Sequence, residues 1–120
     1  MTMQDRRGLG AAAEQRAVDA LTRAGYRVVE RNVRLRVGEL DAVAWEGDVL
    51  VFVEVRSRAD MRFGGAGHAV SLAKQRQVAR CAEAYLARAG TGLRPGGIRF
   101  DVVAVTGEDV VILRDAFRVS

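Results

Sequence analysis

Two strand-like segments separated by only two residues constrain this chain more than any other feature. Residues 38–46 and 49–58 have apolar patterns typical of strands, and Gly47-Asp48 between them suits a two-residue hairpin loop. Alternate residues of the second segment form an apolar row, which consists of Val49, Val51, Val53 and Val55. The sequence therefore predicts an antiparallel hairpin with one face directed to a hydrophobic core.

The other face of this hairpin is expected to carry charge. If Glu46 lies opposite Val49, Asp41 lies opposite Glu54, and Arg56 shares their face. Two acids on adjacent strands repel each other, whereas a divalent cation such as Mg²⁺ or Mn²⁺ would favour the pair. The alternative is that these acids form surface salt bridges with arginines, worth ~0–1 kcal/mol each. Because Glu54 lies within the apolar segment VFVEVR, the pattern weakens the salt-bridge alternative and leaves the metal site open.

A third carboxylate lies on a helix that the sequence predicts over residues 9–24. This segment is rich in alanine and ends at Gly25, a residue that readily adopts the left-handed conformation of a helix cap. Glu14 begins the apolar stripe of this helix, which continues with Ala17, Val18 and Leu21. A buried carboxylate without a partner is costly, so we expect Glu14 to contact an arginine, a metal or a substrate group.

The remaining patterns complete an α/β fold. They predict a strand over residues 26–34, a second helix over residues 71–88, and strands over residues 98–105 and 110–113. The inner stripe of the second helix is expected to consist of Leu72, Gln75, Ala79, Ala82 and Leu86. A helical crossover normally makes the strands on either side of it parallel. We therefore expect one domain over residues 1–120, with a mixed sheet flanked by helices.

The positive charge comes almost wholly from arginine. The chain has 19 Lys+Arg residues against 15 Asp+Glu, a formal net charge of +4, and Lys74 as its only lysine. Arginine suits phosphate groups, so the chain is a candidate nucleic-acid binder. The candidate nucleic-acid contacts are Arg58 at the end of the second strand segment, Arg62 in the loop that follows, and Lys74 and Gln75 at the start of the second helix. For Lys74 and Gln75, the alternative is an ordinary solvated first turn.

Other function classes are disfavoured by what the sequence lacks. No segment approaches the ~20 apolar residues that cross a bilayer, and the opening residues contain no secretory apolar region. A cytoplasmic location without membrane contact is therefore expected. With Cys81 and His68 as the only cysteine and histidine, an internal disulfide is excluded and a histidine metal cluster has little material. The chemistry of this chain must rest mostly on carboxylates.

Three motifs carry a resemblance to a known family. They are GELD at residues 38–41, VFVEVR at residues 51–56 and RFDV at residues 99–102. With these motifs the chain resembles the YraN-like family of small bacterial predicted endonucleases over nearly its whole length. That family looks like the restriction-endonuclease fold of archaeal Holliday junction resolvases, so the resemblance implies an αβββαβ mixed sheet flanked by helices.

The resemblance also implies a catalytic site. The resolvase-like site consists of a helical Glu, a strand Asp and a Glu-x-Lys pair, which correspond here to Glu14, Asp41, Glu54 and Arg56. It implies Mg²⁺ or Mn²⁺ held by Asp41 and Glu54, branched or otherwise structured DNA as the substrate, and a homodimer that addresses two strands.

One position departs from this pattern, because an arginine replaces the expected lysine at Arg56. Arginine stays charged and cannot act as a base, although it can neutralise a phosphate or position water. Two alternatives to the nuclease therefore stay open. One is a nucleic-acid-binding module of the same fold without catalysis, and the other is a small interaction protein that binds an acidic partner.

Overall fold

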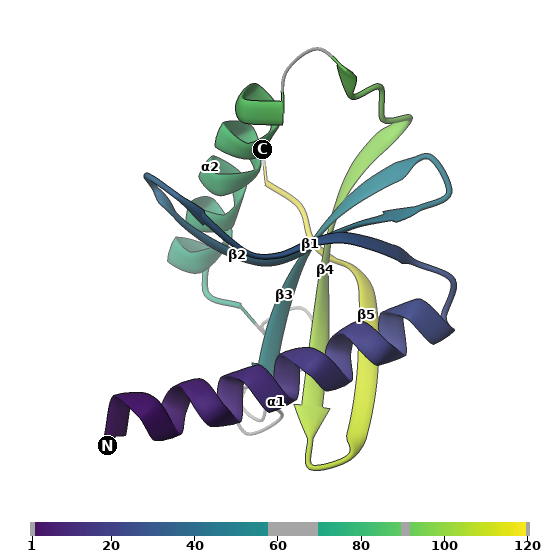
Figure 1. Cartoon of the computed structure of the whole chain (residues 1–120). Coiled ribbons are helices and arrows are strands. Elements are labelled where there is room, and N and C mark those ends of the chain that lie inside the picture. The colour runs from purple at the N-terminus through teal and green to yellow at the C-terminus, as the bar shows by residue number, and fades with distance from the viewer. Residues whose placement is uncertain (1, 58–69, 90–91, 120) are drawn as a thin grey trace.

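A five-stranded mixed sheet lies between two helices in the computed structural model, which describes residues 2–57, 70–89 and 92–119 (Figure 1). The elements in chain order are α1 (Thr2–Arg23), β1 (Arg27–Leu35), β2 (Gly38–Glu46), β3 (Val49–Ser57), α2 (Leu72–Ala89), β4 (Gly97–Thr106) and β5 (Asp109–Phe117). The strands lie in the order β1-β2-β3-β4-β5. Among these strands only β3 and β4 pair in parallel, which confirms that the strands on either side of the helical crossover α2 are parallel.

The β2–β3 hairpin has the expected register. Glu46 pairs with Val49, and the ladder continues to the pair formed by Ala42 and Val53. Gly47 in the loop has a φ of 61°, a conformation that glycine adopts without steric cost. Turn and register therefore agree with the pattern of two that the sequence shows.

The sheet is buried on both faces. Val51 and Val53 of β3 pack with Ala17 and Leu21 of α1 on one face. On the opposite face, a second core includes these residues of β3 and α2: Leu50, Phe52, Val78, Cys81, Ala82 and Tyr85. Because β3 is a central strand with a parallel neighbour, it is apolar on both sides, and its charged residues are confined to its C-terminal end.

The rotation of α2 differs from the expectation. Leu72, expected on the inner stripe, is 66% exposed, whereas Val78, Cys81 and Tyr85 are buried. Of the expected stripe, Ala82 is buried and Leu86 packs at the edge of the same core. The Tyr85 ring packs edge-on against Phe52 at a centroid distance of 5.8 Å, and burial of this large ring accounts for the rotation.

A close approach holds α2 against the start of β2. A Cβ atom at Gly38 would come within 2.9 Å of both Cys81 Sγ and Gln77 Nε2. Glycine at this position therefore allows α2 to pack directly over the strand that carries Asp41. No helix in the described part of the chain is both long and apolar enough to cross a membrane.

Candidate functional site

The hairpin brings Asp41 and Glu54 into contact. Both residues lie one position beyond the Ala42–Val53 pair, Asp41 on β2 and Glu54 on β3. The backbone N–H of Val55 donates a hydrogen bond of 2.8 Å to Asp41 Oδ2, so the Asp41 carboxylate reaches across to β3. The structure therefore confirms the expectation that these two acids are neighbours on adjacent antiparallel strands.

The environment of Glu54 is unusual for a carboxylate. Its residue is only 4% exposed. Burial above all, and then the negative charge of Asp41 and a hydrogen bond with it, raise the pKa of Glu54 to about 8. The ammonium of Lys74 opposes this shift, with its Nζ 3.3 Å from Glu54 Oε2. The fold thus holds the carboxyl groups of Asp41 and Glu54 together where Glu54 has little contact with solvent, an arrangement that disfavours the charged form of Glu54.

Glu14 lies near Asp41, in a cleft between α1 and the first two strands. The cleft has a volume of about 460 Å³ and is lined by Gly10, Ala11, Glu14, Asn32, Arg34 and Glu39. Burial and then the negative charge of Asp41 raise the pKa of Glu14, while a hydrogen bond from Asn32 lowers it. The partner expected for the Glu14 carboxylate is therefore Asn32.

An irregularity of the sheet coincides with this cleft. Asn32 lies between Arg31 and Val33, which pair with Ala42 and Leu40, so that Asn32 is level with Asp41. Its φ of 51° is left-handed, a conformation that asparagine tolerates better than most residues. The local distortion of β1 presents the Asn32 side chain to Glu14 beside the carboxylate pair.

The basic and polar residues expected at the site differ in what they contact. Arg56 is partly exposed, and its buried Nε has no hydrogen-bond partner in the structure as described. Lys74 contacts Glu54, whereas the Gln75 side chain donates a hydrogen bond of 2.9 Å to the carbonyl of Val70. The other two candidate nucleic-acid contacts, Arg58 and Arg62, lie outside the described residues.

The donor set fits one hard divalent cation. Asp41 and Glu54 offer carboxylate oxygens, and Mg²⁺ typically binds to only one or two protein carboxylates. Within residues 2–57, 70–89 and 92–119, no group of three or more His, Cys, Asp or Glu side chains is arranged to hold an ion. Glu14, Asp41 and Glu54 therefore do not form a three-carboxylate group in this part of the chain, and the candidate metal ligands are Asp41 and Glu54 alone.

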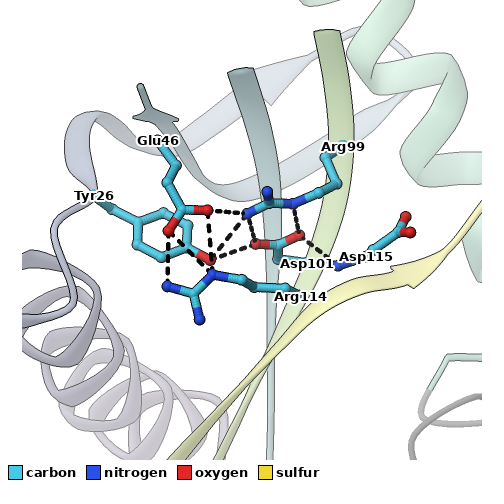
Figure 2. A network of polar contacts seen from close by, with 6 residues as sticks. All are labelled: Tyr26, Glu46, Arg99, Asp101, Arg114 and Asp115. Carbon is cyan, nitrogen blue, oxygen red and sulfur yellow. Dashed lines mark hydrogen bonds and ion pairs between the residues drawn. The ribbon is translucent and has the colours of Figure 1, made fainter. Parts of the chain in front are cut away.

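A second buried acid, Asp101 of β4, lies in the RFDV motif, but the sequence patterns assigned it no role. Its carboxylate is 0% exposed and accepts a hydrogen bond of 2.6 Å from the Tyr26 hydroxyl (Figure 2). It also accepts two hydrogen bonds from Arg99, of 2.8 and 2.7 Å, and one of 2.9 Å from the backbone of Asp115. These donors satisfy the buried charge, so Asp101 has a structural role.

The network extends from Asp101 to the surface through Glu46. Arg99 donates to Oε1 and Arg114 to Oε2 of the Glu46 carboxylate, each at 2.7 Å (Figure 2). This Asp101 network lies on the α1 side of the sheet, whereas Glu54 faces α2. The signal in the sequence was an acid inside the apolar strand segment FDVVAV, the same kind of signal that marked Glu54.

Comparisons with known proteins place these residues in a family. Residues 13–105 match the uncharacterised protein family UPF0102. The UPF0102 protein STH1475 of Symbiobacterium thermophilum is 54% identical over 99 residues, which cover 82% of each chain. The UPF0102 protein BURPS668_3819 of Burkholderia pseudomallei is 49% identical over 114 residues, which cover 94% of this chain and 77% of the relative. The matched region contains Glu14, the carboxylate pair and the start of α2.

Proposed function

Because this chain belongs to the UPF0102 family, a function has to be inferred from its site, and we propose that it is a metal-dependent nuclease that acts on DNA. The observation that carries the proposal is the contact between Asp41 and the buried Glu54. Lys74 already contacts Glu54, yet burial and Asp41 still raise the pKa of Glu54 to about 8, and such a perturbed carboxyl group beside a second acid is typical of a functional site. The resemblance to resolvase-like nucleases supports the same site.

Asp41 and Glu54 would hold Mg²⁺ or Mn²⁺. When bound, such a cation supplies Lewis acidity that activates water and stabilises charge on a phosphate. Asp41 is held toward β3 by the Val55 N–H, so its carboxylate is oriented before any ligand arrives. Glu14, next to Asp41, orients the attacking water, and Arg56 contributes a permanent positive charge near the DNA backbone.

The reaction of this site is hydrolysis of a phosphodiester. The oxygen of one water forms a bond to phosphorus, the bond from phosphorus to the leaving oxygen breaks, and a proton passes from the water to the leaving oxygen. Base identity plays no part in these contacts, because phosphate contacts carry no sequence information. Branched or otherwise structured DNA is the substrate class that we propose, with cleavage directed by shape.

The test is a cleavage assay on single-stranded, duplex and four-way DNA with Mg²⁺ or Mn²⁺. We expect wild-type cleavage and its loss in Asp41→Asn, because a neutral amide cannot replace the charge of the carboxylate at the cation. Asp109→Asn, an exposed acid at the start of β5, is the matched control and should cleave like the wild type. Cleavage unchanged in Asp41→Asn, with a contaminating nuclease ruled out, would contradict this site.

A second candidate function is a nucleic-acid-binding module without catalysis. It is favoured by Arg56, which occupies the lysine position of the related sites and cannot lose its proton. In that case wild type cleaves with neither metal, and Asp41→Asn binds DNA more tightly because a negative charge leaves the path of the phosphates. DNA affinity and DNA cleavage, measured in parallel on wild type and Asp41→Asn, distinguish the two functions.

A further inference from the structure

The first turn of α2 directs the only lysine of the chain at the carboxylate pair. Lys74 precedes the buried residue Val78 by one helical turn, and it therefore belongs to the same inner stripe as Cys81 and Tyr85. Its Nζ lies 3.3 Å from Glu54 Oε2, and its side chain is 33% exposed. The ammonium group therefore has contact with Glu54 on one side and access to solvent on the other.

The start of α2 is held in place by local hydrogen bonds. The Ser71 hydroxyl accepts a bond of 3.2 Å from the Lys74 N–H, and the Ser71 carbonyl accepts one of 2.8 Å from the Gln75 N–H. The Gln75 side chain folds back to the Val70 carbonyl at 2.9 Å. These contacts fix the backbone from which the Lys74 side chain extends, so its position over β3 is determined by the fold.

Arg56 does not make the corresponding contact. It lies two residues beyond Glu54 on the same strand, the position of the lysine in a Glu-x-Lys pair. In the part of the chain that the structure describes, the ion pair of Glu54 is with Lys74, and the Nε of Arg56 is buried without a partner. The cation that touches the buried carboxylate therefore comes from the helix and not from the strand.

We propose that Lys74 is the catalytic lysine of this site, carried on α2 in place of a lysine at position 56. The inference rests on the nuclease activity proposed above. An ammonium has three donors on a compact group, so Lys74 can keep its contact with Glu54 while it donates to a phosphate oxygen of the DNA. There it neutralises the negative charge that develops on the scissile phosphate as the water oxygen bonds to phosphorus.

The first test compares cleavage by Lys74→Gln and Arg76→Gln. Arg76 is an exposed residue of the same helix, so both variants lose one positive charge from the start of α2. We expect a roughly 10²-fold or larger loss of rate in Lys74→Gln, the usual effect of removing one donor to a developing charge. Arg76→Gln should stay within about three-fold of wild type, the spread ordinary for a solvated charge. Lys74→Met is the substitute if Lys74→Gln does not fold.

The second test is rescue. Arg56→Lys introduced into Lys74→Gln returns an ammonium to the strand position, and we expect it to recover about ten-fold or more of the lost rate. A residue that only stabilised the fold would not be replaced in this way, and melting temperatures of all variants report on folding. Equal rates in Lys74→Gln and Arg76→Gln, or no recovery in the double variant, would overturn the assignment of Lys74.

Binding of a four-way DNA junction in Ca²⁺ gives a readout that does not depend on cleavage. Lys74→Gln should lower the slope of log affinity against log salt by ~0.9, the value for one phosphate contact on duplex DNA, together with a loss of affinity larger than that of Arg76→Gln. If wild type does not cleave but this ranking holds, the nuclease proposal fails and Lys74 stands as the phosphate contact. Equal binding by the two variants would overturn the Lys74 assignment by itself.

Discussion

Glu54 makes the stability of the fold depend on pH. Burial and the negative charge of Asp41 raise its pKa to about 8 in the folded chain, against ~4.3 for an unfolded glutamate. Between these values the folded state binds a proton that the unfolded state lacks. The resulting stabilisation is complete below about pH 4.3 and is lost as the pH rises through about 8.

We therefore expect the free energy of unfolding of wild type to fall with pH relative to that of Glu54→Gln, by up to about 1.4 kcal/mol per pH unit within this window. Urea denaturation at a series of pH values measures the difference. At the alkaline end, excess Mg²⁺ should stabilise wild type but not Asp41→Asn, because the cation binds only the folded pair. A constant difference between wild type and Glu54→Gln across the window would contradict this account of Glu54.

Arg56 offers a second experiment at the level of one residue. If Arg56 acts as a permanent charge near the DNA backbone, Arg56→Lys in the otherwise wild-type chain should keep or raise the cleavage rate. Lysine supplies the same charge on a more adaptable stem and restores the residue type of the related sites. Initial rates and DNA affinity of the two proteins decide the matter. Loss of cleavage in Arg56→Lys would show that the planar guanidinium group itself is required.

The connection between α1 and β1 depends on Tyr26. Its hydroxyl donates to Asp101 at 2.6 Å, and this bond ties the end of α1, and with it the helix that carries Glu14, to β4. Tyr26→Phe should cost roughly 1–3 kcal/mol, because the hydrogen bond to the buried carboxylate is lost together with the one of 3.1 Å that the hydroxyl accepts from Arg99. The control is Tyr85→Phe, whose hydroxyl donates at 2.8 Å to Glu30 nearer the surface. Denaturation showing an equal or larger cost for Tyr85→Phe would contradict the structural role given to the Asp101 network.

The hairpin and the rotation of α2 differ in how far sequence determines them. The Gly47-Asp48 loop and the period of two are local, so the contact between Asp41 and Glu54 could be predicted from the sequence. The rotation of α2 depends on Tyr85 packing against Phe52, which lies on another element. That partner is not visible in the pattern of α2, so the sequence pattern predicted that Leu72 is buried. It also did not decide whether Lys74 contacts a phosphate or only solvent.

For the whole molecule, the arrangement of elements was predictable where connection rules apply. The helix between β3 and β4 implied a parallel pair, and the structure has it. The Asp101 network was not predictable in its partners, because Tyr26, Glu46 and Arg114 come from three separate parts of the chain. Only the fold brings them together on the α1 side of the sheet.

The net charge of +4 supports a prediction for the molecule as a whole. If the chain binds DNA through its cations, affinity should fall steeply with salt, because each phosphate that is neutralised releases counterions, with a log–log slope of ~0.9 per contact on duplex DNA. Titration of labelled duplex and four-way DNA over a range of salt concentrations measures this slope, with polyglutamate as a matched acidic competitor without phosphates. No binding of either DNA at low salt, with binding of the acidic polypeptide, would favour the acidic-partner alternative over both nucleic-acid functions. Competition by DNA but not by polyglutamate would instead mean that the arginines recognise phosphate and not negative charge alone, since the guanidinium fork matches phosphate oxygens in pairs.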